Sequence, residues 1–290
     1  MVRLMALLSS LIVGLTSFSS FAEPQHWLVK KGSIEYMIIG SVHVGDDSMY
    51  PLPRAITNYL KTSNGLIIEA DIRSSESIVY PKDSIATKMI LDRAQRRELI
   101  EIAKELGLSE KQLLNSPPWS TALMIQLAFV NKLGYIAENG VDMHLINQAD
   151  ELRIPVLSLE SLQFQVDLIS GQPDSGKEML MSTLKESHRG EEMIQCLIES
   201  WRSGDDNALI EATLTDEASD EFNDAFLYSR NRDWAAKLDS GNLLPQKEGR
   251  YTVVVGSLHL VGQGNLIELL AQRGFEITPL GKTGKARCEI

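Results

Sequence analysis

Runs of hydrophobic residues predict a strand, a helix and a second strand near the start of the chain. Ile34–Ile39 is a continuous apolar run, which is typical of a strand buried on both faces. A helix is predicted after Pro51 and Pro53, because the apolar residues that follow fall on one stripe at helical spacing. Leu66–Ala70 is a second apolar run and predicts the second strand.

The C-terminal part of the chain repeats this order. Tyr251–Val255 predicts a strand, Leu266–Gln272 a helix, and Phe275–Leu280 a further strand. The two parts also share a motif, since Gly40-Ser41-Val42-His43 and Gly256-Ser257-Leu258-His259 both contain glycine, serine, an apolar residue and histidine. We call this four-residue pattern GxxH.

The repeated order predicts the fold class. We expect an α/β fold with a parallel-rich sheet, built from two related βαβ units near residues 34–71 and 251–280 with GxxH at the strand ends. A large helical insertion near residues 83–240 separates them and contains one more short strand, Pro155–Leu159. No linker of low complexity divides residues 23–290, so we predict a single domain whose inserted helices cover the sheet or form a lid over it.

The first 22 residues predict a secretory signal peptide. Arg3 supplies the basic end and Leu4–Leu15 the apolar run, while Ser20 and Ala22 are the small residues before a cleavage point. The alternative is a membrane anchor, but the apolar run is shorter than the roughly 20 residues that a spanning helix needs. We therefore expect an exported protein, periplasmic or extracellular, without stable insertion in a membrane.

Composition and charge narrow the classes of partner. With 43% hydrophobic and 23% charged residues, the chain can bury a core. Its 28 Lys and Arg against 39 Asp and Glu give a net charge of -11, which repels phosphate backbones and argues against nucleic-acid binding. Cys196 and Cys288 can form at most one disulfide, and the sequence leaves open whether they pair. The oligomeric state is equally open.

Three residues are candidates for a metal site. His43 and His259 follow predicted strands, and Glu69 ends another, so the carboxyl ends of parallel strands would bring all three to one crevice. Two imidazoles and a carboxylate suit a divalent metal ion and leave positions open for water or substrate. For each residue alone, a structural hydrogen bond or a salt bridge is the alternative, but the recurrence of GxxH favours a function.

Three further residues are candidates for catalysis or substrate binding. Glu160 also follows a predicted strand, and could orient a ligand histidine, accept a proton as a base, or serve a structural role. Arg230 and Asn231 lie in an amphipathic helix, where polar residues usually face solvent. If they point toward the sheet instead, they could bind a substrate carboxylate or an oxyanion.

The ordered motifs along the chain resemble those of a known family. They are Gly40-Ser41-Val42-His43-Val44-Gly45, Pro51-Leu52-Pro53, Glu69, Pro118-Trp119, Gly140-Val141-Asp142-x-His144-Leu145, Leu159-Glu160, Trp201-x-x-Gly204-Asp205, Arg230-Asn231-x-x-Trp234 and Gly256-Ser257-Leu258-His259-Leu260. Together they resemble the TraB/GumN family, which includes the Tiki proteins, membrane-anchored metal-dependent proteases. The resemblance implies a divalent-metal hydrolase in which His43, His259 and Glu69 belong to the metal site.

Two functions of different classes follow. The leading one is a secreted metal-dependent hydrolase, in which Mn²⁺, Co²⁺ or Zn²⁺ activates water for attack on a peptide or another small substrate. The alternative is a non-catalytic protein that binds a peptide or a metal complex in the same crevice. Because histidine ligands must be deprotonated, metal affinity is expected to fall below about pH 6, with at most two protons taken up per metal lost.

Overall fold

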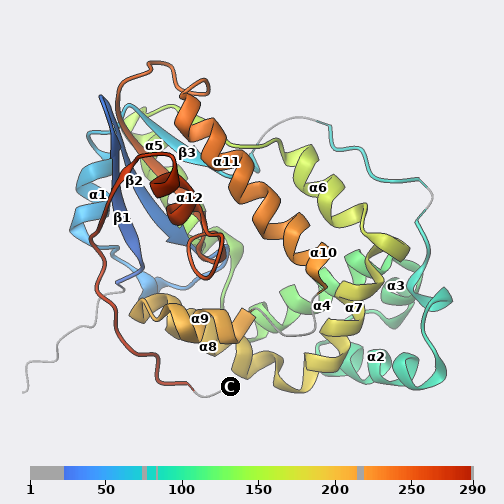
Figure 1. The fold of residues 1–290 in the computed structure, drawn as a ribbon. Coiled ribbons are helices and arrows are strands. Elements are labelled where there is room, and N and C mark those ends of the chain that lie inside the picture. Colours follow the sequence, from blue (N-terminus) through green and yellow to red (C-terminus); the bar gives the residue numbers. More distant parts are fainter. Residues whose placement is uncertain (1–22, 74–76, 83, 214–218, 289–290) are drawn as a thin grey trace, which may run out of the picture.

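The computed structural model describes residues 23–73, 77–82, 84–213 and 219–288. The predicted signal peptide, residues 1–22, lies outside the described residues. The described part of the chain has a mixed α/β fold, with one six-stranded sheet and many helices (Figure 1). Within those ranges, no helix is both long enough and apolar enough to cross a membrane.

The sheet is mostly parallel. Its strands are β1 (His26–Lys31), β2 (Ile34–Ser41), β3 (Gly65–Ile68), β4 (Val156–Ser158), β5 (Gly249–Gly256) and β6 (Glu276–Pro279), in the spatial order β4-β3-β5-β2-β1-β6. The pairs formed among β2, β3, β4 and β5 are parallel, whereas β1 runs antiparallel to both β2 and β6. Antiparallel pairing is therefore confined to one side of the sheet.

The strand–helix–strand order predicted at each end of the chain is present, but the strands of each unit are not neighbours. β5 lies between β2 and β3, while β2 and β1 lie between β5 and β6. Strands from opposite ends of the sequence therefore interleave at the centre of the sheet. Strand β1 was not predicted, because its short apolar stretch Trp27–Val29 is followed at once by the exposed Lys30 and Lys31.

Within the described residues, the α-helices lie in the connections between successive strands, from β2 to β6. They are α1 (Arg54–Leu60), α2 (Arg93–Glu105), α3 (Glu110–Asn115), α4 (Pro118–Lys132), α5 (Val141–Leu152), α6 (Leu162–Ser170), α7 (Pro173–Glu186), α8 (Gly190–Ser203), α9 (Asp206–Thr213), α10 (Asp220–Asn223), α11 (Ser229–Ser240) and α12 (Leu266–Gln272). A π-helical turn, Asp224–Tyr228, joins α10 to α11, and a 3-10 turn, Ser257–His259, follows β5.

Alternating residues of the central strands face two different cores. In β2, Met37 and Ile39 belong to a core with side chains of α1, α5 and α8. Tyr36 and Ile38 belong to a core on the opposite face with side chains of α11 and α12. Helices α2, α3, α4 and α7 form a third core beside the sheet (Figure 1). The inserted helices thus partly cover the sheet and partly pack against one another.

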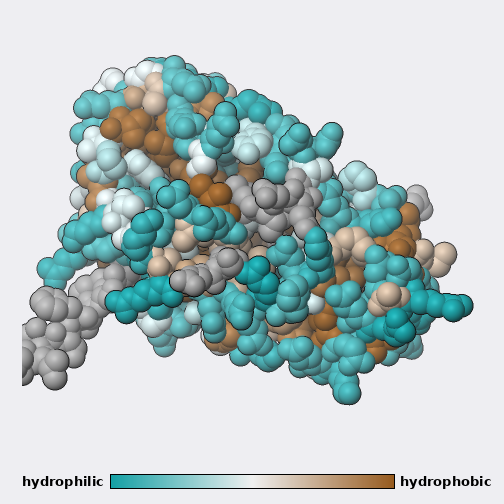
Figure 2. Space-filling view, turned by 60° about the horizontal axis from the view of Figure 1, so that its bottom comes forward, coloured by the Kyte–Doolittle hydropathy of each residue, from teal (hydrophilic) through white to brown (hydrophobic). Residues whose placement is uncertain are grey.

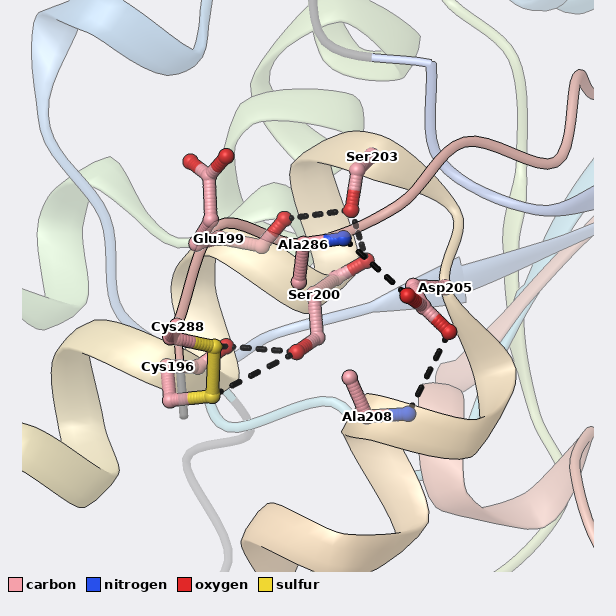
Figure 3. The surroundings of a disulfide bond; sticks show 8 residues. All are labelled: Cys196, Glu199, Ser200, Ser203, Asp205, Ala208, Ala286 and Cys288. Carbon is pink, nitrogen blue, oxygen red and sulfur yellow. Dashed lines mark hydrogen bonds between the residues drawn. A yellow bond between two sulfur atoms is a disulfide. The ribbon is translucent and has the colours of Figure 1, made fainter. Parts of the chain in front are cut away.

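The C-terminal segment is held against α8 and α9. Cys288 forms a disulfide with Cys196 of α8, with 5.4 Å between the two Cα atoms (Figure 3). Upstream, the backbone N–H of Ala286 donates to Asp205 Oδ2 at 3.0 Å, and Gly284 N donates to the carbonyl of Ser203 at 2.7 Å. The pairing of the two cysteines, which the sequence left open, is therefore present in the structure.

Candidate functional site

The two GxxH motifs lie side by side at the carboxyl ends of neighbouring parallel strands. β2 and β5 pair in register, with Ser41 opposite Gly256. The hydroxyl of Ser257 donates to the carbonyl oxygen of Ser41 at 2.9 Å and ties the two segments together. A side chain at Gly40 would force Ser257 to shift, because its Cβ would stand 2.7 Å from Ser257 Oγ and 3.3 Å from Ser257 Cα. The close approach of the two motifs therefore depends on glycine.

The predicted metal-site residues converge around Gly256. A Cβ on this glycine would stand 3.2 Å from Glu69 Oε1, 3.7 Å from His259 Cδ2 and 3.9 Å from His43 Nε2. The backbone N–H of Gly256 donates to Glu69 Oε1 at 2.7 Å. We call His43, Glu69, Glu160, Arg230 and His259 the strand-end site. Residues far apart in the sequence meet there because β5 lies between β2 and β3.

His43 forms the exposed side of the site. Its Nδ1–H donates to Asp142 Oδ2 at 2.9 Å, and the other carboxylate oxygen of Asp142 accepts from Ser41 Oγ at 2.8 Å. The charge of Asp142 raises the pKa of His43 to about 9, although the side chain is 67% exposed. The second ring nitrogen, Nε2, has no hydrogen-bond partner within the described chain.

His259 is buried and stays neutral. Its Nδ1–H donates to Asn231 Oδ1 at 2.7 Å, while Asn231 Nδ2 donates to the carbonyl of Gly264 at 3.0 Å. The ring centroid lies 4.3 Å from that of Trp234. Burial lowers the pKa of His259 to about 4, so the imidazole is uncharged at neutral pH. Asn231 therefore fixes the tautomer of His259 and places its Nε2 lone pair toward the centre of the site.

Arg230 lies at the centre of the strand-end site and uses all five of its N–H groups. Nη2 donates to Glu69 Oε2 at 2.6 Å and to Glu160 Oε1 at 2.5 Å, and Nε donates to Glu160 Oε2 at 3.3 Å. Nη1 donates to the carbonyl of Phe226 at 3.1 Å and to His259 Nε2 at 3.2 Å. Because a guanidinium has five N–H donors, none is left for a substrate in this arrangement.

The two carboxylates of the site share donors besides Arg230. Gln165 Nε2 donates to Glu160 Oε1 at 2.9 Å and to Glu69 Oε2 at 3.2 Å, and Trp234 Nε1 donates to Glu160 Oε2 at 3.1 Å. Burial raises the pKa of Glu69, but the nearby imidazole and guanidinium groups outweigh it and lower the pKa overall. The guanidinium also lies over the Trp234 ring, 4.6 Å from its centroid.

These residues fit a divalent cation in their donor chemistry. Two imidazole Nε2 atoms and the Glu69 carboxylate are suitable ligands, and each imidazole has its Nδ1–H held by an oxygen. The present arrangement is built around the guanidinium, and across the described ranges no three His, Cys, Asp or Glu side chains are placed to hold a metal ion. A cation at this position therefore competes with Arg230 for Glu69 and His259.

Three contributors to the site were given no role from the sequence. Asp142 stands in a quoted motif at the start of α5, and an acidic residue after Gly140-Val141 was the available signal. Trp234 stands three residues beyond Asn231 in another quoted motif. Gln165 of α6 carries no sequence signal, because that helix was not predicted.

Comparison with known proteins places the chain in a family. The TraB/PrgY/gumN family matches residues 25–279. YbaP of Escherichia coli K12 is 31% identical over 240 residues, which cover 82% of this chain and 89% of YbaP. YbaP of Shigella flexneri is 32% identical over 234 residues, which cover 80% and 86%. No solved structure matches the chain. The chain therefore belongs to the TraB/PrgY/gumN family.

Proposed function

We propose that this protein is an exported, divalent-metal-dependent hydrolase that acts on peptide bonds, as the resemblance to the Tiki proteins implies. The observation that carries the proposal is the convergence of His43, Glu69 and His259 around Gly256. Each imidazole has its Nδ1–H held by an oxygen, which leaves Nε2 as the ligand atom. The paired GxxH segments are proposed to be repeats of one ancestral unit, in line with the opposite positions of Ser41 and Gly256.

Some residues of the site would bind the metal, and others would orient the metal ligands. His43, Glu69 and His259 would hold Mn²⁺, Co²⁺ or Zn²⁺, which when bound lowers the pKa of water and polarises a carbonyl. Asp142 orients His43, and Asn231 orients His259. Because His43 is the exposed member and Glu69 and His259 are buried, substrate would reach the site past His43.

Glu160 and Arg230 would supply proton transfer and charge. Glu160 is the second carboxylate of the site, and we assign it the transfer of a proton between water and the leaving amine. Arg230 would stabilise a developing oxyanion through its positive charge, since its N–H groups are all bonded within the protein. Export is supported by the Cys196–Cys288 disulfide, because disulfides persist in oxidising compartments.

The second candidate is a protein that binds a peptide or a metal complex without turnover. It is favoured by Arg230, which joins both carboxylates of the site at 2.6 and 2.5 Å and leaves no preformed set of three metal ligands within the described chain. In this function the same residues would serve recognition alone.

A metal titration run beside a peptide-library cleavage assay tests the proposal. The protein should bind Mn²⁺, Co²⁺ or Zn²⁺ and cleave peptides, and a chelator should stop the cleavage. His43→Ala and His259→Ala should each lose metal binding and cleavage, while the exposed His188→Ala should keep both. Thermal unfolding of each variant shows whether the loss reflects the site or the fold.

The outcomes separate the two functions. Binding of metal without cleavage of any peptide would support the binding protein instead. Full metal affinity in both histidine variants would remove the strand-end site as a metal centre.

A further inference from the structure

A cavity lies among the inserted helices, outside the strand-end site. It has a volume of about 500 Å³ and is bounded by α4, α7, α8, α9 and α10, which lie in the lower part of Figure 1. Its apolar lining includes Phe129, Met179, Ile194, Leu197 and Phe222. This volume lies within the usual range of ligand pockets, roughly 300–1,000 Å³, and leaves room for large apolar side chains.

The charged side chains that line the cavity are acidic. Glu178 and Glu186 line it, and none of the described residues that line it is basic. Glu178 accepts hydrogen bonds from the backbone and hydroxyl of Ser219, whereas the carboxylate of Glu186 has no hydrogen bond or ion pair within the described residues. An apolar lining with an unpaired carboxylate suits an apolar group that carries a positive charge beside it.

The lining is adaptable as well as apolar. Met179 and Met193 both line the cavity and are partly exposed. Methionine side chains are flexible and polarizable, and surfaces that bind varied apolar groups often use them. The occupant is therefore expected to be defined by its apolar character and charge, with tolerance for the exact side chain.

Figure 2 shows hydrophobic side chains gathered in separate patches on a mostly hydrophilic face of the molecule, so large apolar surfaces are limited on that face.

One continuous helical segment links the cavity to the strand-end site. Phe222 lines the cavity and stacks on Phe226, with 4.2 Å between the ring centroids. The carbonyl of Phe226 accepts from Arg230 Nη1 at 3.1 Å. Eight residues separate Phe222 from Arg230, about 12 Å along a helix axis. An extended peptide covers this distance with about four residues.

We propose that this cavity binds an apolar side chain of a peptide whose neighbouring residues are basic. The inference rests on the proposed function where it identifies that peptide as a substrate of the strand-end site. The cavity then selects peptides with an apolar residue next to lysine or arginine, about four residues from the bond that is cleaved.

Methyl NMR on metal-free protein labelled at the methionine methyl groups tests the binding directly. Acetyl-Leu-Phe-Lys-Lys-amide should shift the Met179 and Met193 methyl signals and leave the methionines outside the cavity unchanged. Acetyl-Leu-Phe-Glu-Glu-amide should bind at least about tenfold more weakly, because exposed charges at the rim attract one peptide and repel the other. Equal affinity for the two peptides, or no shift with either, overturns the proposal.

Three variants locate the binding. Ser182→Trp places a bulky side chain on the lining and should abolish the shifts. Glu186→Lys should reverse the preference between the two peptides, whereas the same change at the exposed Glu248, outside the lining, should leave it unchanged. Unaltered binding in Ser182→Trp overturns the proposal. Methyl shifts that appear with rising protein concentration, before any peptide is added, would show that a second copy fills the cavity and also overturn it.

The design separates this inference from the proposed function. Binding is measured with a chelator present, so it does not depend on cleavage. If the lysine peptide binds at the cavity but no peptide is cleaved, the cavity assignment holds and the hydrolase does not. If peptides are cleaved and Ser182→Trp leaves kcat/KM unchanged for a longer peptide, in which Leu-Phe-Lys-Lys is followed by about four further residues, the hydrolase holds and the role of the cavity is overturned.

Discussion

At the scale of single residues, the two histidines of the strand-end site have similar positions but different charge states. The partner of His43 is the charged Asp142, which raises the pKa of His43 to about 9. The partner of His259 is the neutral Asn231, and burial lowers the pKa of His259 to about 4. Without metal, His43 is therefore protonated and positively charged at neutral pH, while His259 is neutral.

This difference changes the expected proton count. Only His43 has to lose a proton when a metal binds near neutral pH, so about one proton is released per metal instead of two. Metal affinity is then expected to rise with pH up to about 9. The pKa of His43 thus moves the expected loss of metal affinity from below about pH 6 to below about pH 9.

Asp142→Asn should lower the pKa of His43 from about 9 toward its ordinary value, because the carboxylate favours the charged ring. Above pH 9, where His43 is deprotonated in both proteins, it should weaken metal binding by about tenfold, because the carboxylate orients the ring and raises its basicity. NMR titration of the imidazole and metal calorimetry measure the two effects. Asp150→Asn removes an equal charge from the same helix, where Asp150 pairs with Arg73, and should change neither quantity. An unchanged His43 pKa in Asp142→Asn would contradict the assigned role.

Arg230→Met should raise the affinity for Mn²⁺ by at least about tenfold, because it removes a positive charge that contacts both Glu69 and His259. Without metal, the same variant should lose about 3–5 kcal/mol of unfolding free energy, since two buried carboxylates lose their partner. Calorimetry and urea unfolding measure these changes. Arg232→Met breaks only the exposed pair with Asp224 and serves as the control. Equal Mn²⁺ affinity in Arg230→Met and the parent protein would rule out competition.

At the scale of elements, the start of α5 supports the loop that carries His43. The backbone N–H of Val141 donates to the carbonyl of Val42 at 3.0 Å, and Asp142 follows in the first turn of the helix. At the other end of the loop, Trp201 Nε1 of α8 donates to the carbonyl of Gly40 at 2.9 Å. Two helices on one face of the sheet therefore fix the position of His43.

Gly140→Ala should disturb this support. A Cβ on Gly140 would stand 2.5 Å from the carbonyl oxygen of His43, so the loop or the helix has to shift. We expect a loss of about 1–3 kcal/mol in the free energy of unfolding and weaker metal binding. The matched control is Gly190→Ala, where a Cβ would lie 3.4 Å from the Phe129 ring and alanine favours the helix. Urea unfolding compares the two, and equal stability would contradict the expected clash.

At the scale of the whole molecule, the chain has two cores on the sheet and a third among the inserted helices. α4 and α7 belong to the third core, whereas α8 reaches both the first core and the C-terminal segment. The disulfide therefore joins the end of the chain to a helix that packs on the sheet and helps to hold the His43 loop.

The double variant Cys196→Ala/Cys288→Ala should lose up to about 4.6 kcal/mol of unfolding free energy, because the bridge closes a loop of 92 residues in the unfolded chain. Denaturant unfolding measures the loss, and the parent protein under reducing conditions should match the variant. Thiol counting on unreduced, denatured protein should find no free thiol. Two free thiols would contradict the bridge.

The stability of the metal-free protein should peak near pH 6.5. Because the pKa of His259 is lowered to about 4, its contribution is present above about pH 6.5 and is lost as the pH falls toward 4. Because the pKa of His43 is raised to about 9, its contribution is present below about pH 6.5 and is lost as the pH rises through 9. Urea unfolding in the presence of a chelator measures the profile. His43→Ala should flatten only the alkaline side, and an unchanged alkaline side would contradict the His43 shift.

Local sequence pattern determined the elements that surround the site. Ile34–Ile39 lies within β2, and Leu266–Gln272 has the bounds of α12, because continuous apolar runs and helical stripes record burial directly. The two GxxH motifs also lie beside each other, since parallel strands bring their carboxyl ends to one edge. The elements depend on residues that are near one another in the chain, and the meeting of the two motifs follows from the parallel direction of their strands, so both could be predicted from the sequence.

Tertiary structure alone decided what each polar group contacts. The interleaving of β5 between β2 and β3 brings Arg230 of α11 to Glu69 and leaves its five N–H groups bonded inside the protein. The role of Asp142 likewise depends on the packing of α5 against the His43 loop. Sequence spacing carries no record of such partners, because hydrogen bonds and burial are set by the distances between atoms far apart in the chain. The charge states of His43 and His259 follow from those distances.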